Sequence, residues 1–203
     1  MKVILVRNLL KTLVVVDSIV VEDNFLTSDE IKLLYDICWN SDLYLKGVES
    51  NYANEDRDSR KWSLTKFIHT YDSNYKFYNL LAKRILQHSS INGKYECFRI
   101  LLNAYKYSDV LSVHTDVHDN LAGCKTALIY GNEKWDINWG SETVFLSSME
   151  PDAEILKSVI PKPGRLVMFD ADIPHTGRPP VSVFPNYRYS IAFNLRPKSN
   201  SFI

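Results

Sequence analysis

Two segments that lie far apart in the chain carry the residue types that most constrain its fold. His114 and Asp116 are separated by one residue, and His175 follows much later. Side chains two residues apart project from the same face of a β-strand, whereas a helix would point them about 200° apart. The spacing therefore predicts that His114 and Asp116 lie on extended chain, in a fold that brings His175 beside them.

The sequence around both segments favours strands. Residues 109–113 include β-branched and aliphatic side chains without a helical stripe, which predicts a strand leading to His114. His175 follows another strand-like run, residues 165–169, which the Lys-Pro-Gly turn at 162–164 precedes. Both groups are therefore expected at the ends of strands.

Two imidazoles and one carboxylate are the ligands that hold a non-haem Fe(II) on one face and leave the opposite positions open. A single histidine in a strand-rich core is more often structural than ligating. The combination of His-X-Asp with a distal histidine and a following Arg-X-Ser carries the prediction. We therefore expect His114, Asp116 and His175 to be the metal ligands and the catalytic centre.

Residues 187–195 alternate between large apolar side chains and smaller or polar ones, which predicts a strand with two unlike faces. Arg188 and Ser190 share the less hydrophobic face. An arginine in this position is suited to bind a carboxylate through paired, charge-assisted hydrogen bonds. A metal with open coordination positions, next to an arginine that binds a carboxylate, is typical of a site for a keto acid. Arg178 is the alternative carboxylate binder, but the alternation favours Arg188.

On these motifs the chain resembles the Fe(II)- and 2-oxoglutarate-dependent dioxygenases, with a layout like that of the prolyl 4-hydroxylase-like branch. The resemblance runs from about Val21 to Pro197. The segments that match the family's strands are residues 103–105 leading to His114, 126–130, 139–145 and 163–170. Three features depart from the family pattern: Ser108 replaces a usual glycine, Gly140-Ser141 replaces a double glycine, and the proline-containing loop at 176–186 is longer than usual.

The resemblance implies Fe(II), 2-oxoglutarate as cosubstrate and O2, with ascorbate as a candidate reductant. It implies hydroxylation of an unactivated C–H bond with release of succinate and CO2. The substrate would be amino-acid-like, peptidyl or a natural product. Halogenating relatives replace the carboxylate ligand with a small residue, so Asp116 favours hydroxylation, desaturation or ring formation.

Tyr130 matches a family tyrosine that hydrogen-bonds the far carboxylate of 2-oxoglutarate, and Tyr105 is a second candidate for cosubstrate binding. Either could instead be an ordinary aromatic residue of a strand. His118 is expected to be a loop residue, although it could contact substrate or metal. The basic group Arg57, Arg60 and Lys61 is either a solvated loop face or part of a substrate lid.

Two other functional classes stay open. One is a cupin-like metal dioxygenase that uses no keto acid, which a jelly-roll fold and the same metal ligands would also accommodate. The other is a non-catalytic binding protein that retains the fold. The intact His-Asp-His set argues against this second class.

The order of the elements predicts an α+β, mainly β fold. Thr27 and Glu30 form a capping box that starts one helix, and residues 73–87 have the apolar spacing of a second. Beyond Tyr95 strand follows strand. We therefore expect a double-stranded β-helix, or jelly roll, with N-terminal helices packed on one sheet. Residues 1–203 would form one domain, with helical support and N-terminal strands in 1–94 and the jelly-roll core in 95–197.

Composition limits the partners. The 24 basic and 24 acidic residues cancel, so no nucleic acid partner is expected. Cys38, Cys97 and Cys124 are widely spaced, which fits reduced thiols in a cytoplasmic protein. No apolar run reaches membrane-spanning length, so no membrane association is expected. A small molecule or a peptide is the expected partner, and the sequence leaves the oligomeric state open.

Overall fold

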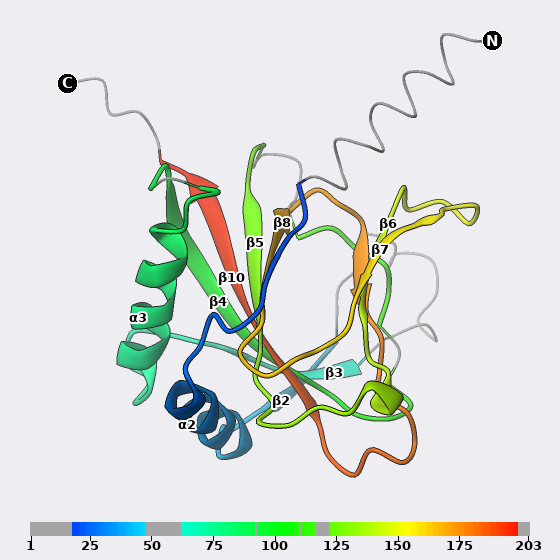
Figure 1. Cartoon of the computed structure of the whole chain (residues 1–203), viewed down its shortest axis with the longest axis horizontal. Coiled ribbons are helices and arrows are strands. Elements are labelled where there is room, and N and C mark those ends of the chain that lie inside the picture. Colours follow the sequence, from blue (N-terminus) through cyan, green and yellow to red (C-terminus); the bar gives the residue numbers. More distant parts are fainter. Residues whose placement is uncertain (1–17, 48–61, 92, 110, 117–121, 199–203) are drawn as a thin grey trace, which may run out of the picture.

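The computed structural model describes residues 18–47, 62–91, 93–109, 111–116 and 122–198. In this part of the chain a seven-stranded sheet, in the order β1-β8-β5-β10-β4-β3-β2, faces a three-stranded sheet, in the order β7-β6-β9 (Figure 1). Every paired strand is antiparallel. The two sheets form a jelly roll, so the predicted fold class is confirmed.

The strands of the large sheet are β1 (Val20–Glu22), β2 (Tyr44–Gly47), β3 (Trp62–Phe67), β4 (Tyr95–Tyr105), β5 (Lys125–Tyr130), β8 (Leu166–Asp170) and β10 (Arg188–Pro197). Those of the small sheet are β6 (Thr143–Leu146), β7 (Ile155–Val159) and β9 (His175–Gly177). The helices are α2 (Ser28–Trp39), α3 (Tyr75–Leu86) and the 3-10 turn η2 (Ile137–Trp139). Because β3 pairs with β4, the predicted parts 1–94 and 95–197 share one sheet.

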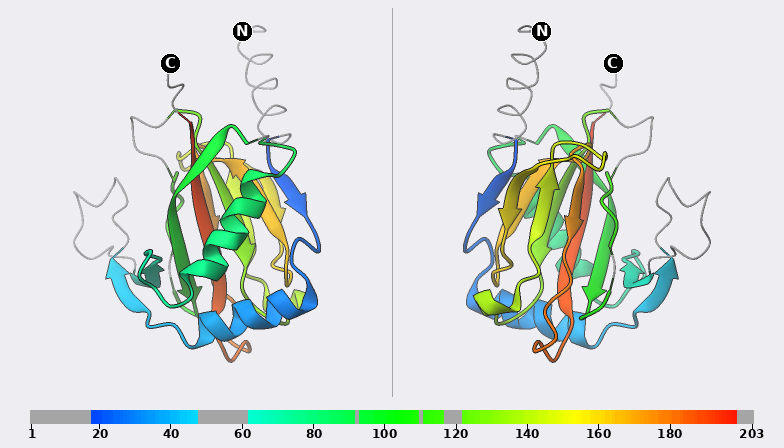
Figure 2. Two further views of the ribbon diagram at one scale, coloured as in Figure 1. Left: turned by 90° about the vertical axis from the view of Figure 1, so that its left-hand side faces the viewer. Right: turned by 90° about the vertical axis from the view of Figure 1, so that its right-hand side faces the viewer.

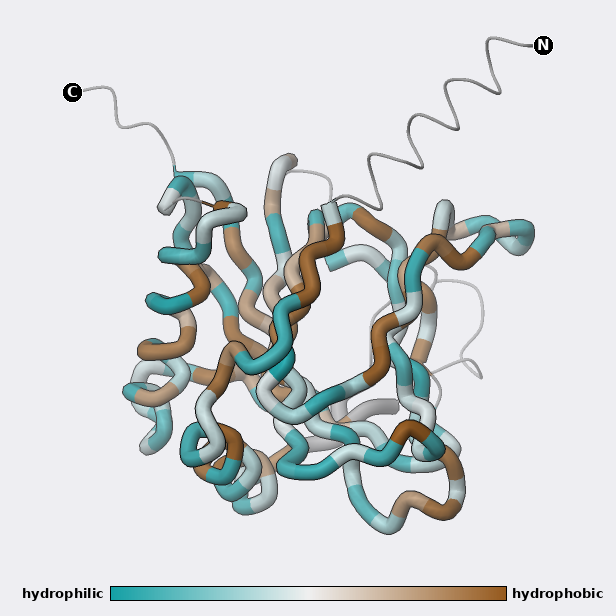
Figure 3. The backbone as a smooth tube through the Cα atoms, viewed as in Figure 1, coloured by the Kyte–Doolittle hydropathy of each residue, from teal (hydrophilic) through white to brown (hydrophobic). Residues whose placement is uncertain are grey.

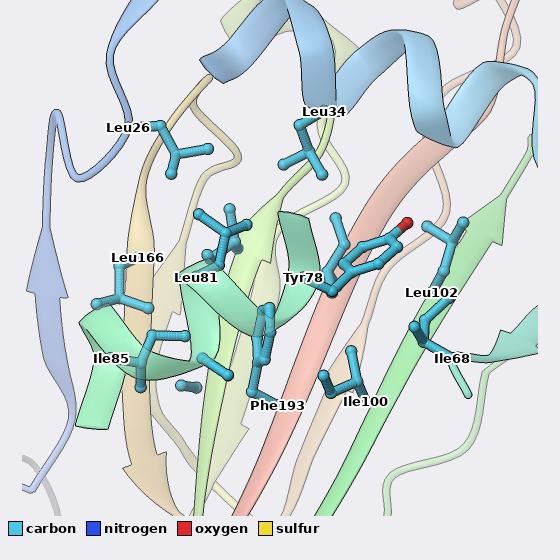
Figure 4. Packing of buried hydrophobic residues seen from close by; sticks show 14 of the residues in the cluster. Leu26, Leu34, Ile68, Tyr78, Leu81, Ile85, Ile100, Leu102, Leu166 and Phe193 are labelled. Atoms are coloured by element: carbon cyan, nitrogen blue, oxygen red, sulfur yellow. The ribbon is translucent and has the colours of Figure 1, made fainter. Parts of the chain in front are cut away.

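Both helices cover the outer face of the large sheet (Figure 2). Leu34 from α2 and Leu81 and Ile85 from α3 pack with Leu102 of β4 and Phe193 of β10 in one buried cluster (Figure 4). A second cluster fills the space between the sheets, with members Ile19, Leu128, Tyr130, Phe145, Val159, Val167, Phe169, Ile173 and Ala192. The central strands of the large sheet are therefore buried on both faces.

The first helix begins as predicted. The Glu30 backbone N–H donates to Thr27 Oγ1 at 3.3 Å, and the Thr27 N–H donates to the Glu30 carboxylate at 2.9 Å, which completes the capping box. Leu33 of α2 and Leu80 of α3 are exposed, so not every large apolar residue of the helices is buried. Each helix contacts the sheet through one side only. Accordingly, both helices contain hydrophilic as well as hydrophobic positions (Figure 3).

Two predicted strands are absent or shortened. The described residues of 109–113 form no strand, and extended pairing is limited to one bridge, in which His114 and His175 exchange backbone hydrogen bonds of 3.0 and 2.9 Å. The chain turns immediately after β4, since the Asp109 N–H donates to the Lys106 carbonyl. In the predicted strand 139–145, only Thr143 and the residues after it form a continuous strand, because η2 and two residues with positive φ come first, and Gly140 forms an isolated bridge with Pro180.

Ser108 and Ser141 stand at positions where relatives were expected to carry glycine, and both have positive φ angles, 73° and 69°. Such angles are uncommon for residues with a Cβ atom. The backbone at both serines therefore has a conformation that favours glycine.

This conformation makes Ser108→Gly a stabilising substitution. Ser108 is exposed, so we expect relief of the left-handed backbone to exceed the extra chain entropy of glycine and to raise the free energy of unfolding by about 0.5 kcal/mol. Urea unfolding measures the change. Ser182→Gly is the matched control, because Ser182 is also exposed in a turn but lacks a positive φ, and it should lower stability. A loss of stability in both variants would contradict the explanation.

Among the described residues, no helix is long and apolar enough to cross a membrane.

Candidate active site

The fold brings His114, Asp116 and His175 together inside the jelly roll. Their ligating atoms all lie within 4.8 Å of one another. Asp116 Oδ1 is 3.6 Å from His114 Nε2, and Asp116 Oδ2 is 3.7 Å from His175 Nε2. The single bridge between His114 and His175 makes this approach possible, because it joins the segment after β4 to the start of β9.

Both imidazoles are held in the tautomer that a metal requires. The Nδ1 atom of His114 lies 3.0 Å from the Ser112 carbonyl, and that of His175 lies 2.9 Å from the Ile173 carbonyl. A carbonyl only accepts hydrogen bonds, so each Nδ1 carries the proton and donates it. Each Nε2 then presents a lone pair towards the centre of the cluster, as in metal sites where a backbone carbonyl orients the ligand.

The charges of the cluster suit a divalent cation. Burial lowers the pKa of His175 to about 4, so this imidazole is neutral near pH 7. Burial opposes ionisation of Asp116 as well, but the two imidazoles and the Thr126 hydroxyl outweigh it and hold the pKa of this carboxyl well below its ordinary value. The pKa of His114 is lowered by burial but raised overall by Asp116. The result is an ionised carboxylate between two imidazoles.

Arg188, on β10, is buried with only 1% of its surface exposed. Its guanidinium donates to Ser190 Oγ at 3.1 Å, to Thr143 Oγ1 at 2.9 Å and to the Ser141 carbonyl at 3.2 Å. No acidic side chain in the described part of the chain forms an ion pair with it. A buried cation with only neutral partners is costly, so the surroundings of Arg188 are suited to an anion.

In the strand register, the residue that contacts Arg188 and the residue that pairs with a metal-ligand histidine are two positions apart. In the small sheet His175 pairs with Phe145, and Gly177 pairs with Thr143, which contacts Arg188. Two residues along a strand span about 7 Å, close to the length of a five-carbon chain. On the large sheet, the paired side chains Leu101, Ala192 and Leu128 lie between the Arg188 end and the metal end. This apolar row matches the methylene groups of such a chain.

The sequence model of the 2OG-Fe(II) oxygenase superfamily matches residues 100–196, a span that holds all three candidate metal ligands and Arg188. These residues are similar to that superfamily. The resemblance predicted from the sequence is confirmed, and the oxygenases of this superfamily use Fe(II), 2-oxoglutarate and O2. A search of curated protein sequences found no match.

Solved structures of oxygenases share the fold. A prolyl-4-hydroxylase from Pseudomonas putida is 20% identical, with a TM-score of 0.64 over 92% of this chain and 99% of that one. A Trichoplax adhaerens prolyl hydroxylase, in complex with a hypoxia inducible factor peptide fragment, is 17% identical, with a TM-score of 0.60 over 95% and 92%. HygX from Streptomyces hygroscopicus, with nickel and 2-oxoglutarate bound, is 11% identical, with a TM-score of 0.62 over 93% and 87%. At these identities the likeness concerns the fold.

Two tyrosines lie against the guanidinium of Arg188. The Arg188 guanidinium lies 5.4 Å from the ring centre of Tyr105 and 5.2 Å from that of Tyr130. The Tyr130 hydroxyl donates to the Val159 carbonyl at 3.2 Å and lies 2.9 Å from Thr143 Oγ1. Tyr105 has no hydrogen bond from its hydroxyl to any described residue, and burial raises its pKa to about 12, so it keeps its proton. Tyr105 is therefore the more available donor, and Tyr130 fixes Thr143.

The remaining candidate residues are either exposed or outside the described residues. Arg178 is exposed, and its backbone N–H donates to the Glu142 carbonyl. His118 and the basic group of Arg57, Arg60 and Lys61 are not among the residues that the structure describes. Thr176 and Gly177 belong to β9, so the long loop predicted at 176–186 begins at Arg178.

Sequence reasoning did not identify Thr143, which contacts Arg188, or Thr126, whose hydroxyl donates to Asp116 Oδ2 at 2.6 Å. Both threonines lie on strands and face the site. Their alternation with neighbouring residues indicates a face, but the partner across the sheet depends on strand register. A local sequence pattern does not encode that register.

Proposed function

We propose that the chain is a 2-oxoglutarate-dependent hydroxylase in which His114, Asp116 and His175 hold Fe(II). Arg188, with Ser190 and the Tyr105 hydroxyl, would receive the far carboxylate of 2-oxoglutarate, and Tyr130 would brace this end of the pocket. The observation that carries the proposal is the buried guanidinium, which has no acidic partner among the described residues. It contacts Thr143, which pairs two positions along β9 from His175, one of the cluster of two imidazoles and a carboxylate.

The protein residues would bind, orient and shield the reacting groups. Bound iron, with 2-oxoglutarate and O2, would supply the oxidation of a C–H bond with release of succinate and CO2. Phe169 and Phe145 pack against His175, with ring centres 4.7 and 6.0 Å away, and limit the access of water to this ligand. Arg188 would neutralise the cosubstrate in a pocket where an unpaired carboxylate would be costly.

We propose that the substrate is an amino acid, either as a residue of a peptide or as the free molecule. The Pseudomonas and Trichoplax proteins with this fold are prolyl hydroxylases, and the Trichoplax structure contains a peptide. A natural product is the alternative, because SnoK, a carbocyclase from nogalamycin biosynthesis, has a TM-score of 0.61 at 12% identity. Ascorbate as reductant and a cytoplasmic location stay predictions, and the free thiols of Cys38, Cys97 and Cys124 agree with the second.

Anaerobic titration tests the proposal. Fe(II) is added to the apoprotein, 2-oxoglutarate follows, and the visible charge-transfer band of a chelated keto acid is recorded. We expect the band in the parent protein and in Arg178→Ala, which removes an exposed arginine of the same region, and its loss in His175→Ala. Iron binding without the band would favour the cupin-like class. A band without succinate release, across a screen of peptides and amino acids, would favour a non-catalytic protein.

A further inference from the structure

The Asp116 carboxylate stands at the end of a hydrogen-bond chain that crosses three strands. Arg99 Nε donates to Asn194 Oδ1 at 2.8 Å, Asn194 Nδ2 donates to Thr126 Oγ1 at 3.1 Å, and Thr126 Oγ1 donates to Asp116 Oδ2 at 2.6 Å. Asn194 pairs with Arg99 across the β4–β10 ladder and with Thr126 across the β10–β5 ladder. The register of β4, β10 and β5 therefore places Arg99, Asn194 and Thr126 side by side in one hydrogen-bonded row.

The arginine fixes the direction of every bond in the row. A guanidinium has donors only, so Asn194 must turn its carbonyl oxygen towards Arg99 and its amide nitrogen towards Thr126. The Thr126 hydroxyl then accepts from Asn194 and gives its single proton to Asp116. Asn194 and Thr126 each have 1% of their surface exposed, which leaves little room for water to replace these bonds.

We propose that Arg99, Asn194 and Thr126 are positioning residues that hold Asp116 as a one-oxygen metal ligand. This inference rests on the proposed function, because it takes Asp116 as a ligand. Each oxygen lies near one imidazole, Oδ1 at 3.6 Å from His114 Nε2 and Oδ2 at 3.7 Å from His175 Nε2. Only Oδ2 also accepts the Thr126 proton, which leaves Oδ1 for the metal. A carboxylate that binds through one oxygen keeps the remaining positions open for a chelating keto acid and O2.

Arg99 also holds the backbone of the ligand. Its Nη2 donates to the Asp116 main-chain carbonyl at 3.4 Å, so one guanidinium acts on both the backbone and, through the row, the side chain of this residue. Support of this kind typically changes metal affinity 10- to 100-fold. A row that served only to satisfy buried polar groups would affect folding stability and leave metal affinity unchanged.

Co(II) titration of the apoprotein, followed by its visible absorption, separates these roles. Thr126→Val keeps the shape of the side chain but removes the hydroxyl, and we expect Co(II) affinity to fall 10- to 100-fold. Thr126→Ser restores the hydroxyl and should bind Co(II) nearly as tightly as the parent. Asn194→Leu should weaken binding about tenfold. In the double variant, Asn194→Leu should add nothing to the loss caused by Thr126→Val, because Asn194 acts through Thr126.

The outcomes also separate this proposal from the proposed function. Unchanged affinity in Thr126→Val, or fully additive losses in the double variant, would overturn the positioning role while leaving the metal site in place. Failure of the parent protein to bind Co(II) any better than His175→Ala would overturn the metal site and this inference with it. Thermal unfolding of each apoprotein verifies that the compared variants are folded.

Discussion

The Asp116→Ala variant is expected to release no succinate above background and to lose most of its affinity for Fe(II). Asp116 is the one carboxylate of the cluster, and it is buried and ionised between two imidazoles. Its loss would leave a divalent cation with neutral protein ligands only. By comparison with buried ion pairs that lose one partner, we expect a cost of about 3–5 kcal/mol. This cost corresponds to a 10²- to 10³-fold or larger fall in affinity.

Anaerobic titration with Fe(II) or Co(II) measures the affinity, and mass spectrometry of succinate measures turnover. Asp172→Ala is the matched control, because Asp172 is an exposed aspartate just before the third ligand and should be replaceable without effect. Full activity in Asp116→Ala would show that the assigned ligand set is wrong. Unfolding temperatures of both apoproteins exclude a trivial loss of structure.

The second large effect is expected at Arg188. Arg188→Met keeps a long side chain but removes the charge, so the half-saturating concentration of 2-oxoglutarate should rise about 10²- to 10³-fold. This estimate corresponds to roughly 3–4 kcal/mol, within the range found when one member of a buried charge pair is truncated. Metal affinity should be unchanged, because the guanidinium contacts Ser190, Thr143 and Ser141 rather than the metal ligands.

The thermal stability of the apoprotein gives an independent test of whether Arg188 serves binding or structure. Arg188 is a buried cation that lacks an acidic partner among the described residues, so its replacement by methionine should leave the unfolding temperature unchanged or higher. Arg178→Met is the control for 2-oxoglutarate affinity and should behave like the parent. A destabilised Arg188→Met variant with unchanged affinity for 2-oxoglutarate would assign Arg188 a structural role only.

Several features of the fold and site follow from local sequence. The capping box of Thr27 and Glu30 predicted where α2 begins, because both bonds form within one helical turn. The spacing of His114 and Asp116 placed both side chains towards one point even though the preceding residues form no strand. Alternation along β10 put Arg188 and Ser190 on one face, where they now share a hydrogen bond. These patterns depend on backbone geometry alone.

Tertiary structure decided the rest. Arg188 is buried and Arg178 is exposed, and this difference depends on how the two sheets close over β10. The row of Arg99, Asn194 and Thr126 exists because β4, β10 and β5 pair in one particular register, with residues that lie far apart in the sequence. Alternation specifies which face a side chain occupies. Long-range pairing specifies its neighbours, and only the folded chain determines that pairing.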